Sequence, residues 1–249
     1  MSILKIDRHK RILQAIADRQ RVALSDLESE LRASRITIQR DLVELENRGL
    51  LKRFHGGAMS RDYAGNLYDH TLRKTLNVDI KRKIAAKAAN LIKPGAHIGM
   101  DASSTVYYLS ECMFPENIQV LTLGVDTFAK LSEHPHVQLV LAGGRLNRMT
   151  NTLSGSEAVS VIRNYHFDLC FISAESFVPG FGFVDPYADE IMVKQALMKA
   201  SEKTVILLDS SKITQSAGLV LCSADQVDHL VTDNPLDKEL KKIFKGKIL

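Results

Sequence analysis

Residues 34–49 read SRITIQRDLVELENRG, and this stretch decides the fold of the N-terminal region. Ile38, Leu42 and Leu45 recur at the three- and four-residue spacing of a helix that buries one face. Ser34 is a suitable N-cap residue, and Gly49 is a suitable C-terminal stop. The stretch therefore predicts a helix over residues 35–48.

Two helices are predicted before this one. Residues 8–19 carry apolar side chains at helical spacing, namely Ile12, Leu13 and Ile16. Ser25 followed by Glu28 has the form of a capping box. It would start a helix over residues 26–31, with Leu27 and Leu31 directed inward. Arg32-Ala33 then makes the turn into the third helix.

A short apolar and basic segment follows the third helix. Residues 50–58 read LLKRFHGGA, which predicts a strand closing on two glycines as a hairpin-like wing. Three helices with a tight turn between the second and third, followed by a wing, describe a winged helix-turn-helix. We expect this domain to occupy residues 1–58.

The excess positive charge of the chain is confined to this region. Residues 1–58 hold 12 Lys and Arg against 8 Asp and Glu, whereas residues 59–249 hold 21 of each. Such an asymmetry points to a polyanionic partner for the first segment alone. The alternative is a solvated basic face on a small helical bundle.

The third helix and the wing carry the candidate DNA contacts. Arg can donate two hydrogen bonds to guanine and Gln can pair with adenine, and the first turns of a recognition helix reach base edges. Basic side chains on the wing suit phosphates. We expect Asp41 to pair with a neighbouring arginine rather than to face phosphate. The candidates are Ser34, Arg35, Thr37, Gln39, Arg40, Lys52, Arg53 and His55.

The remainder of the chain changes pattern. Residues 59–78 lack periodicity and are interpreted as a linker, and residues 79–91 predict a helix. From residue 96 onward, short apolar runs alternate with helical stretches, which predicts an α/β fold with a mostly parallel, Rossmann-like sheet over 79–249. The runs are 97–100, 119–123, 137–142, 168–172, 204–208 and 229–231, and the helical stretches are 104–112, 125–133, 156–165, 188–201 and 236–244.

Polar residues and glycines follow these predicted strands. Ligands of open parallel sheets bind at the carboxyl ends of the strands, and hydroxyls, backbone amides and a lysine suit a phosphate. A carboxylate suits sugar hydroxyls. We therefore expect a small phosphorylated sugar or polyol as effector. Ser103–Thr105 equally suits a helix cap, and Gly143-Gly144 a plain turn. The candidates are Asp101, Ser103, Ser104, Thr105, Thr122, Gly143, Gly144, Arg145, Ser173, Asp209, Ser211 and Lys212.

The N-terminal segment resembles the helix-turn-helix of DeoR-family regulators. The family pattern has Ser, then T-I-R-R-D-L, L-E-x-x-G and a wing ending H-G-G-A. The matching residues are Ser34, Thr37, Ile38, Arg40, Asp41, Leu42, Leu45, Glu46, Gly49, His55, Gly56, Gly57 and Ala58. Gln39 stands where the family has the first of two arginines, so the resemblance implies DNA binding with an altered operator preference.

The resemblance continues more loosely into the second domain, which is similar to DeoR-type sensor domains related to ribose-5-phosphate isomerase. Asp209–Lys212 matches a D-S-S-K segment, and Glu190 with Lys194 matches an E-x-x-x-K helix, which implies a role for Lys194 at the effector site. Ser103 replaces a glycine and Leu123 an asparagine of the family pattern. The resemblance implies a regulator, most simply a repressor of a carbohydrate operon that its effector releases from DNA.

Several classes of protein are disfavoured. No apolar run reaches the ~20 residues needed to cross a bilayer, and the N-terminus does not read as a signal peptide. Three scattered cysteines argue for a reducing compartment, so we expect a cytoplasmic protein. His134 and His136 have metal-ligand spacing but lack a third ligand, so neither a metal nor a cofactor is expected.

Two other functions stay open at this point. One is a sugar-phosphate isomerase with Asp101 or Asp209 as base and Lys212 as electrostatic partner. The other is a regulator whose second domain serves mainly oligomerisation. Because a single helix-turn-helix binds DNA weakly, we expect a homodimer or larger assembly.

Overall fold

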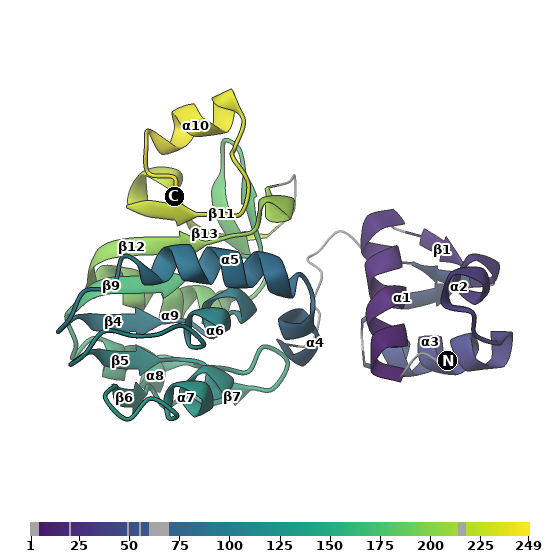
Figure 1. The fold of residues 1–249 in the computed structure, drawn as a ribbon, viewed down its shortest axis with the longest axis horizontal. Coiled ribbons are helices and arrows are strands. Elements are labelled where there is room, and N and C mark those ends of the chain that lie inside the picture. The colour runs from purple at the N-terminus through teal and green to yellow at the C-terminus, as the bar shows by residue number, and fades with distance from the viewer. Residues whose placement is uncertain (1–4, 20, 49, 55, 60–69, 214–217) are drawn as a thin grey trace. The chain divides into compact units, whose positions relative to one another are not determined.

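The computed structural model describes residues 5–19, 21–48, 50–54, 56–59, 70–213 and 218–249. They form two compact units that divide between Leu76 and Asn77 (Figure 1). No helix in these ranges is long and apolar enough to cross a membrane.

The first unit combines helices with a small antiparallel sheet. Its elements are α1 (Lys5–Arg19), β1 (Arg21–Ala23), α2 (Leu24–Leu31), α3 (Arg35–Asn47), β2 (Lys52–Phe54), β3 (Gly57–Met59) and α4 (His70–Thr75). The strand order is β1-β3-β2, so β2 and β3 form the predicted hairpin wing. Every apolar residue predicted to face inward on the three helices is buried.

The structure differs from the sequence predictions for this unit at three points. Ser25 lies inside α2, which begins at Leu24 with Ala23 as a cap residue that makes no side-chain bond. Residues 21–23, for which no element was predicted, form strand β1, because three residues are enough to pair with the wing strand β3. The linker expected at 59–78 contains helix α4, whose six residues are too few to show a helical period.

The second unit is built on a six-stranded parallel sheet. The strands are β4 (His97–Met100), β5 (Gln119–Thr122), β6 (Gln138–Leu141), β9 (Phe167–Ile172), β12 (Ser201–Leu207) and β14 (His229–Val231), in the order β14-β12-β9-β4-β5-β6. The helices are α5 (Val78–Ala89), α6 (Ser104–Leu109), α7 (Val125–Leu131), α8 (Ser156–Ile162), α9 (Ala188–Lys199) and α10 (Lys238–Phe244). All six predicted strands are present, which confirms the α/β class.

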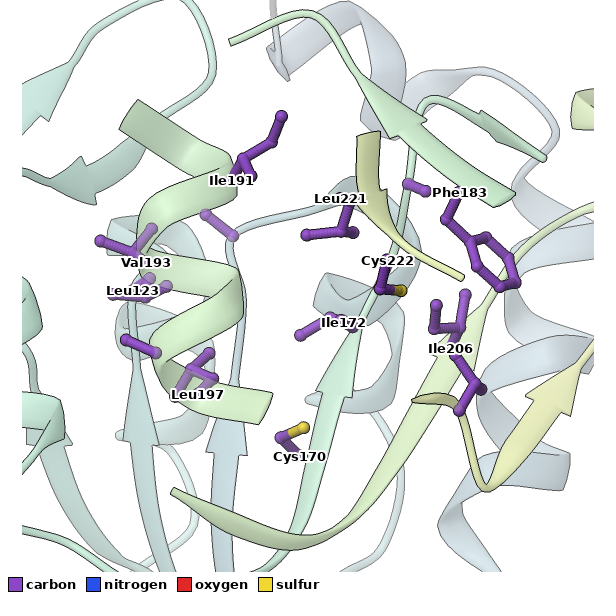
Figure 2. Packing of buried hydrophobic residues seen from close by; sticks show 14 of the residues in the cluster. Leu123, Cys170, Ile172, Phe183, Ile191, Val193, Leu197, Ile206, Leu221 and Cys222 are labelled. Atoms are coloured by element: carbon purple, nitrogen blue, oxygen red, sulfur yellow. The ribbon is translucent and has the colours of Figure 1, made fainter. Parts of the chain in front are cut away.

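Both faces of this sheet are covered, as the apolar strands predicted. On β9, Leu169 and Phe171 face the core formed with α5 and α6, whereas Cys170 and Ile172 face the core formed with α8 and α9. Figure 2 shows the second core, in which Val193 and Leu197 of α9 approach the sheet. Successive strand residues therefore anchor opposite layers.

Short antiparallel strands were not predicted. β7 (Arg145–Asn147) pairs with β8 (Thr152–Ser154), and a second sheet has the order β10-β11-β13, comprising Ser176–Val178, Gly182–Asp185 and Leu219–Cys222. Strands of three or four residues are too short to show a clear alternation of polar and apolar positions. The second sheet matters because its strand β11 contributes a carboxylate to the candidate site.

Candidate DNA-binding surface and effector site

The outer face of α3 is a stripe of side chains that point toward solvent. Ile36, Gln39, Arg40, Val43, Glu44 and Asn47 line a shallow hollow together with Arg53 of the wing. The spacing of these residues is i, i+3, i+4 and i+7, which places them on one side of the helix. The opposite side is the buried stripe of Ile38, Leu42 and Leu45.

The first turn of α3 is fixed by its cap. Ser34 Oγ accepts a hydrogen bond from the Thr37 amide at 3.4 Å and lies 2.9 Å from Thr37 Oγ1. The predicted cap is therefore confirmed. The Thr37 hydroxyl is already engaged within it, so a base contact by this side chain competes with the cap.

The arginines predicted to contact DNA differ in whether they already form ion pairs within the protein. Arg53 Nε lies 2.5 Å from Glu46 Oε2, and Arg35 Nε lies 4.0 Å from Glu28 Oε1. Arg40 and Gln39 are exposed, and among the described residues neither side chain has a hydrogen bond or an ion pair. Arg40 is thus the guanidinium on this face that is ready for an external acceptor. His55 and the Lys52 side chain lie outside the described residues.

A buried ionic cluster ties α3 to α1. Asp41 accepts hydrogen bonds from Arg8 and, at 3.0 Å, contacts His9 Nε2. The hydrogen bond to Asp41 raises the pKa of Arg8 above its ordinary value, although burial opposes it. This contact confirms that Asp41 pairs within the domain and does not face phosphate.

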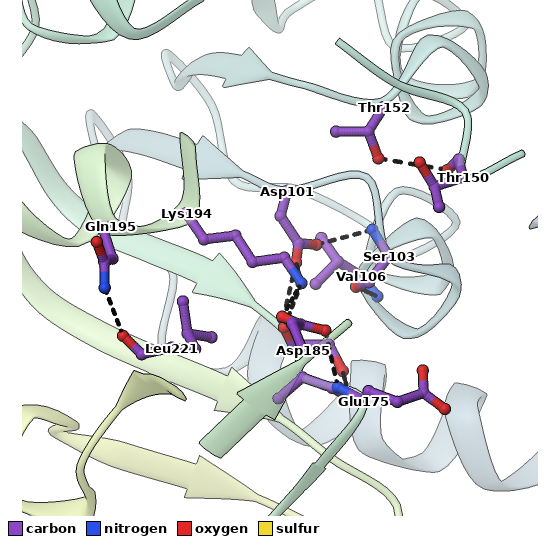
Figure 3. Close-up of polar contacts among 12 residues, drawn as sticks. Asp101, Ser103, Val106, Thr150, Thr152, Glu175, Asp185, Lys194, Gln195 and Leu221 are labelled. Carbon is purple, nitrogen blue, oxygen red and sulfur yellow. Dashed lines mark hydrogen bonds and ion pairs between the residues drawn. The ribbon is translucent and has the colours of Figure 1, made fainter. Parts of the chain in front are cut away.

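The centre of the second unit is the junction between β4 and β9. The chain runs from β4 outward through β5 and β6 on one side, and through β9, β12 and β14 on the other. Asp101, which follows β4, accepts hydrogen bonds at 2.9 Å from the amides of Ser103 and Ser173 (Figure 3). The two strand ends are therefore held together at the point where ligands of such sheets bind.

Lys194 of α9 lies beneath this junction. Its Nζ donates at 2.8 Å to Asp185 Oδ2 and to the Ser173 carbonyl, and it lies 3.5 Å from Asp101 Oδ2. Burial disfavours its charge, but Asp185, Asp101 and Glu190 outweigh burial and raise its pKa. Only 5% of Lys194 is exposed, so its ammonium neutralises buried carboxylates and does not face solvent.

The sequence did not reveal Asp185. It sits in the four-residue strand β11, nine positions before Lys194, where no cap or motif marks it. The one available signal was the position of Lys194 between Ile191 and Leu197 at helical spacing, since an ammonium buried with that apolar face requires a carboxylate partner.

The segment after β12 reaches toward the same junction. Asp209 caps the single 3₁₀ turn Ser210–Lys212 and accepts hydrogen bonds from the Ser211 amide and hydroxyl. Lys212 Nζ donates to the carbonyl of Ala174, the residue after Ser173, at 3.2 Å. Lys212 is only half-buried, which makes it the cation at this junction that solvent can reach.

Other predicted residues serve local structure. Ser103 caps α6 by accepting a hydrogen bond from the Val106 amide at 3.3 Å, and Ser104 and Thr105 are buried in that helix. The hydroxyl of Thr122 accepts from the Gly124 amide at 3.1 Å, and Thr122 has no exposed surface. The interpretation of Ser103–Thr105 as a helix cap accounts for these contacts.

Gly143, Gly144 and Arg145 lie farther along the sheet edge. They follow β6, which is two strands, about 10 Å, from β4 and four strands, about 19 Å, from β12. Gly144 has φ of +100°, and a Cβ there would lie 2.6 Å from the Ser154 carbonyl oxygen. The backbone thus requires this glycine without any ligand.

Comparison with known protein families identifies the family of this chain. Residues 8–63 match the family model of the DeoR-like helix-turn-helix domain, and residues 76–234 match that of the DeoR C terminal sensor domain. The chain belongs to the DeoR family of transcriptional regulators. Its DNA-binding class is thereby established, and the resemblance proposed from the sequence is confirmed.

Two curated DeoR-family relatives illustrate the range of the match. The HTH-type transcriptional regulator GolR of Listeria innocua is 33% identical, with 96% of this chain and 94% of that protein covered. The lactose phosphotransferase system repressor of Streptococcus mutans is 30% identical, with 97% of each chain covered. Both relatives are named as regulators, not as enzymes.

Among solved structures, ribose 5-phosphate isomerase from Plasmodium falciparum aligns with 55% of this DeoR-family chain and 53% of its own. The TM-score is 0.39 and the identity is 14%. A similarity this distant carries no argument about activity.

Proposed function

We propose that this DeoR-family chain is a sequence-specific repressor of a carbohydrate catabolic operon, released from its operator by a phosphorylated sugar or polyol. Operator binding is supported by the outward face of α3. Gln39 and Arg40 are exposed there, and among the described residues neither side chain has a hydrogen bond or an ion pair. An Arg–Gln pair one residue apart can address adjacent guanine and adenine edges in the major groove.

The effector half rests on the junction of β4, β9 and β12. Lys212 supplies an accessible positive charge there, and Ser211 beside it is exposed, so both can contact a phosphate or a polyol. Buried Asp101 and Lys194 hold the strand ends beneath it. We accordingly assign direct contact to Lys212 and Ser211 and a positioning role to Asp101 and Lys194.

This arrangement favours a sensor over an isomerase. A general base must reach the proton that it removes. Asp101 has no exposed surface and lies against Lys194, while Asp209 is 3% exposed and caps its own turn. Both carboxylates are therefore committed to the protein, and the relatives named as regulators support the same conclusion.

Self-association is part of the proposal. One recognition helix contacts few base pairs, so operators are usually read by pairs of helices on two half-sites. We assign the assembly to the second unit, as a homodimer or larger, which leaves the first unit to the DNA. Sedimentation of the full chain measures this directly, and a monomer at all concentrations would contradict it.

A thermal-shift screen of the full chain against phosphorylated sugars and polyols tests the effector. A ligand that binds the folded state raises the melting temperature as its concentration exceeds its Kd. Lys212→Ala should abolish the shift and the release from operator DNA, while Lys199→Ala, an exposed lysine at the end of α9, should retain both. A Lys212→Ala protein that responds like the wild type would refute the assigned site.

A further inference from the structure

Ile36 is the anomalous residue on the outer face of α3. It is 63% exposed, although isoleucine is among the side chains that proteins bury most often. A single exposed isoleucine would mean little by itself. Here it is the second residue of the helix whose opposite side is fully packed, and it lines the same hollow as Gln39 and Arg40.

Helical geometry fixes where Ile36 points. At 100° per residue, Ile36 and Arg40 each lie about 160° from the centre of the buried stripe at Ile38, on either side of the outward pole. They are also one turn apart, so their side chains are neighbours. Any groove that receives Arg40 therefore receives Ile36 at the same depth and one turn nearer the start of the helix.

The major groove offers one apolar group to such a side chain. Its edges carry hydrogen-bond donors and acceptors except at the C5-methyl group of thymine. Isoleucine placed over a cytosine would bury the N4 amino group without an acceptor, which costs binding energy. Packing against a thymine methyl removes apolar surface of both partners from water.

We propose that Ile36 reads a thymine methyl group in the operator, beside the base pair that Arg40 contacts. The inference rests on the proposed binding of operator DNA through α3. It adds a specificity-determining residue that makes no hydrogen bond, and it predicts a preferred thymine at one position of each half-site. Gln39 and Arg40 then read the polar edges, and Ile36 reads the methyl.

Removal of single thymine methyl groups from the operator DNA tests this proposal. An operator is first selected from a random duplex pool with the full chain, and each thymine is then replaced singly by deoxyuridine, which lacks only the methyl group. One replacement per half-site should weaken binding by the wild type about three- to fivefold, the effect of one buried methyl. Ile36→Ala should bind the thymine duplex more weakly and should show no thymine preference there, while Ile36→Val should retain it.

Val43→Ala is the matched control, because Val43 is an exposed apolar residue two turns further along the same face. It should keep the thymine preference at the position assigned to Ile36. The salt dependence of binding should be the same for Ile36→Ala and the wild type, since no phosphate contact is lost. Unchanged affinity for every deoxyuridine duplex, or equal sensitivity in Ile36→Ala, would overturn the methyl contact alone. Failure to enrich any duplex would overturn operator binding as well.

Discussion

Asp41 on α3 accepts a hydrogen bond from Arg8 on α1, with Asp41 Oδ1 3.1 Å from Arg8 Nη2. His9 of α1 contacts the same carboxylate oxygen at 3.0 Å. Because all three side chains are buried, this cluster fixes the orientation of the recognition helix against the rest of its unit.

Removing the shared carboxylate should loosen the first unit. Asp41→Ala removes the carboxylate that Arg8 and His9 share inside the domain, and breaking a buried ion pair in this way costs about 3–5 kcal/mol. Hydrogen exchange of the full chain should show faster exchange in α1 and α3, with the second unit unchanged as an internal reference. Glu30→Ala, which breaks the exposed Arg19–Glu30 pair, should leave exchange in the core of the first unit unaltered. Equal protection in wild type and Asp41→Ala would contradict the assigned role.

Arg40→Ala should strongly weaken specific operator binding without destabilising the protein. Arg40 is exposed and has no partner among the described residues, so its loss leaves no buried group uncompensated. A bidentate contact to a base is worth about 1–3 kcal/mol, so affinity should fall on the order of tenfold or more. Gel-shift titration and thermal melting measure the two effects. Arg163→Ala, an exposed arginine of the second unit, should leave both unchanged, and operator affinity retained by Arg40→Ala would exclude the assignment.

Lys194→Met should destabilise the second unit by about 3 kcal/mol or more, since Asp185 and Asp101 lose their buried counter-ion. The pKa of Lys194 is raised above its ordinary value of 10.5 in the folded protein. Its contribution is therefore complete below that value and declines as the pH rises above it. Urea unfolding should show a constant difference between wild type and variant up to about pH 10, and a shrinking one beyond. A difference that grows with pH would reverse this interpretation.

Substituting the two adjacent glycines after β6 separates backbone strain from steric fit. Gly143→Ala places a Cβ in open space at φ of +75°, which should cost about 1–2 kcal/mol. Gly144→Ala adds a clash with the Ser154 carbonyl and should cost clearly more. Urea unfolding ranks the two variants. If the folded Gly143→Ala protein loses its response to effector, the loop belongs to the effector site after all.

Local patterns predicted the elements whose signal is contained in a short stretch of chain. The period of Ile38, Leu42 and Leu45 together with Ser34 specified α3, and six apolar runs specified the parallel strands. The same reasoning missed β1, the paired strands β7 and β8, and the sheet of β10, β11 and β13. Apart from β13, these missed strands carry only one or two apolar residues each, so no continuous apolar run marks them.

By itself the sequence determined that a basic winged helix-turn-helix precedes an α/β domain, and that Ile38, Leu42 and Leu45 are buried on α3. Only the tertiary structure decided which charged groups are already paired. Lys194 was expected to meet the effector, but Asp185 and Asp101 surround it, while Arg40 has no competing carboxylate among the described residues. The reason is physical: burial and ion pairing depend on which distant segments the fold brings together, whereas helical periodicity depends on neighbours along the chain.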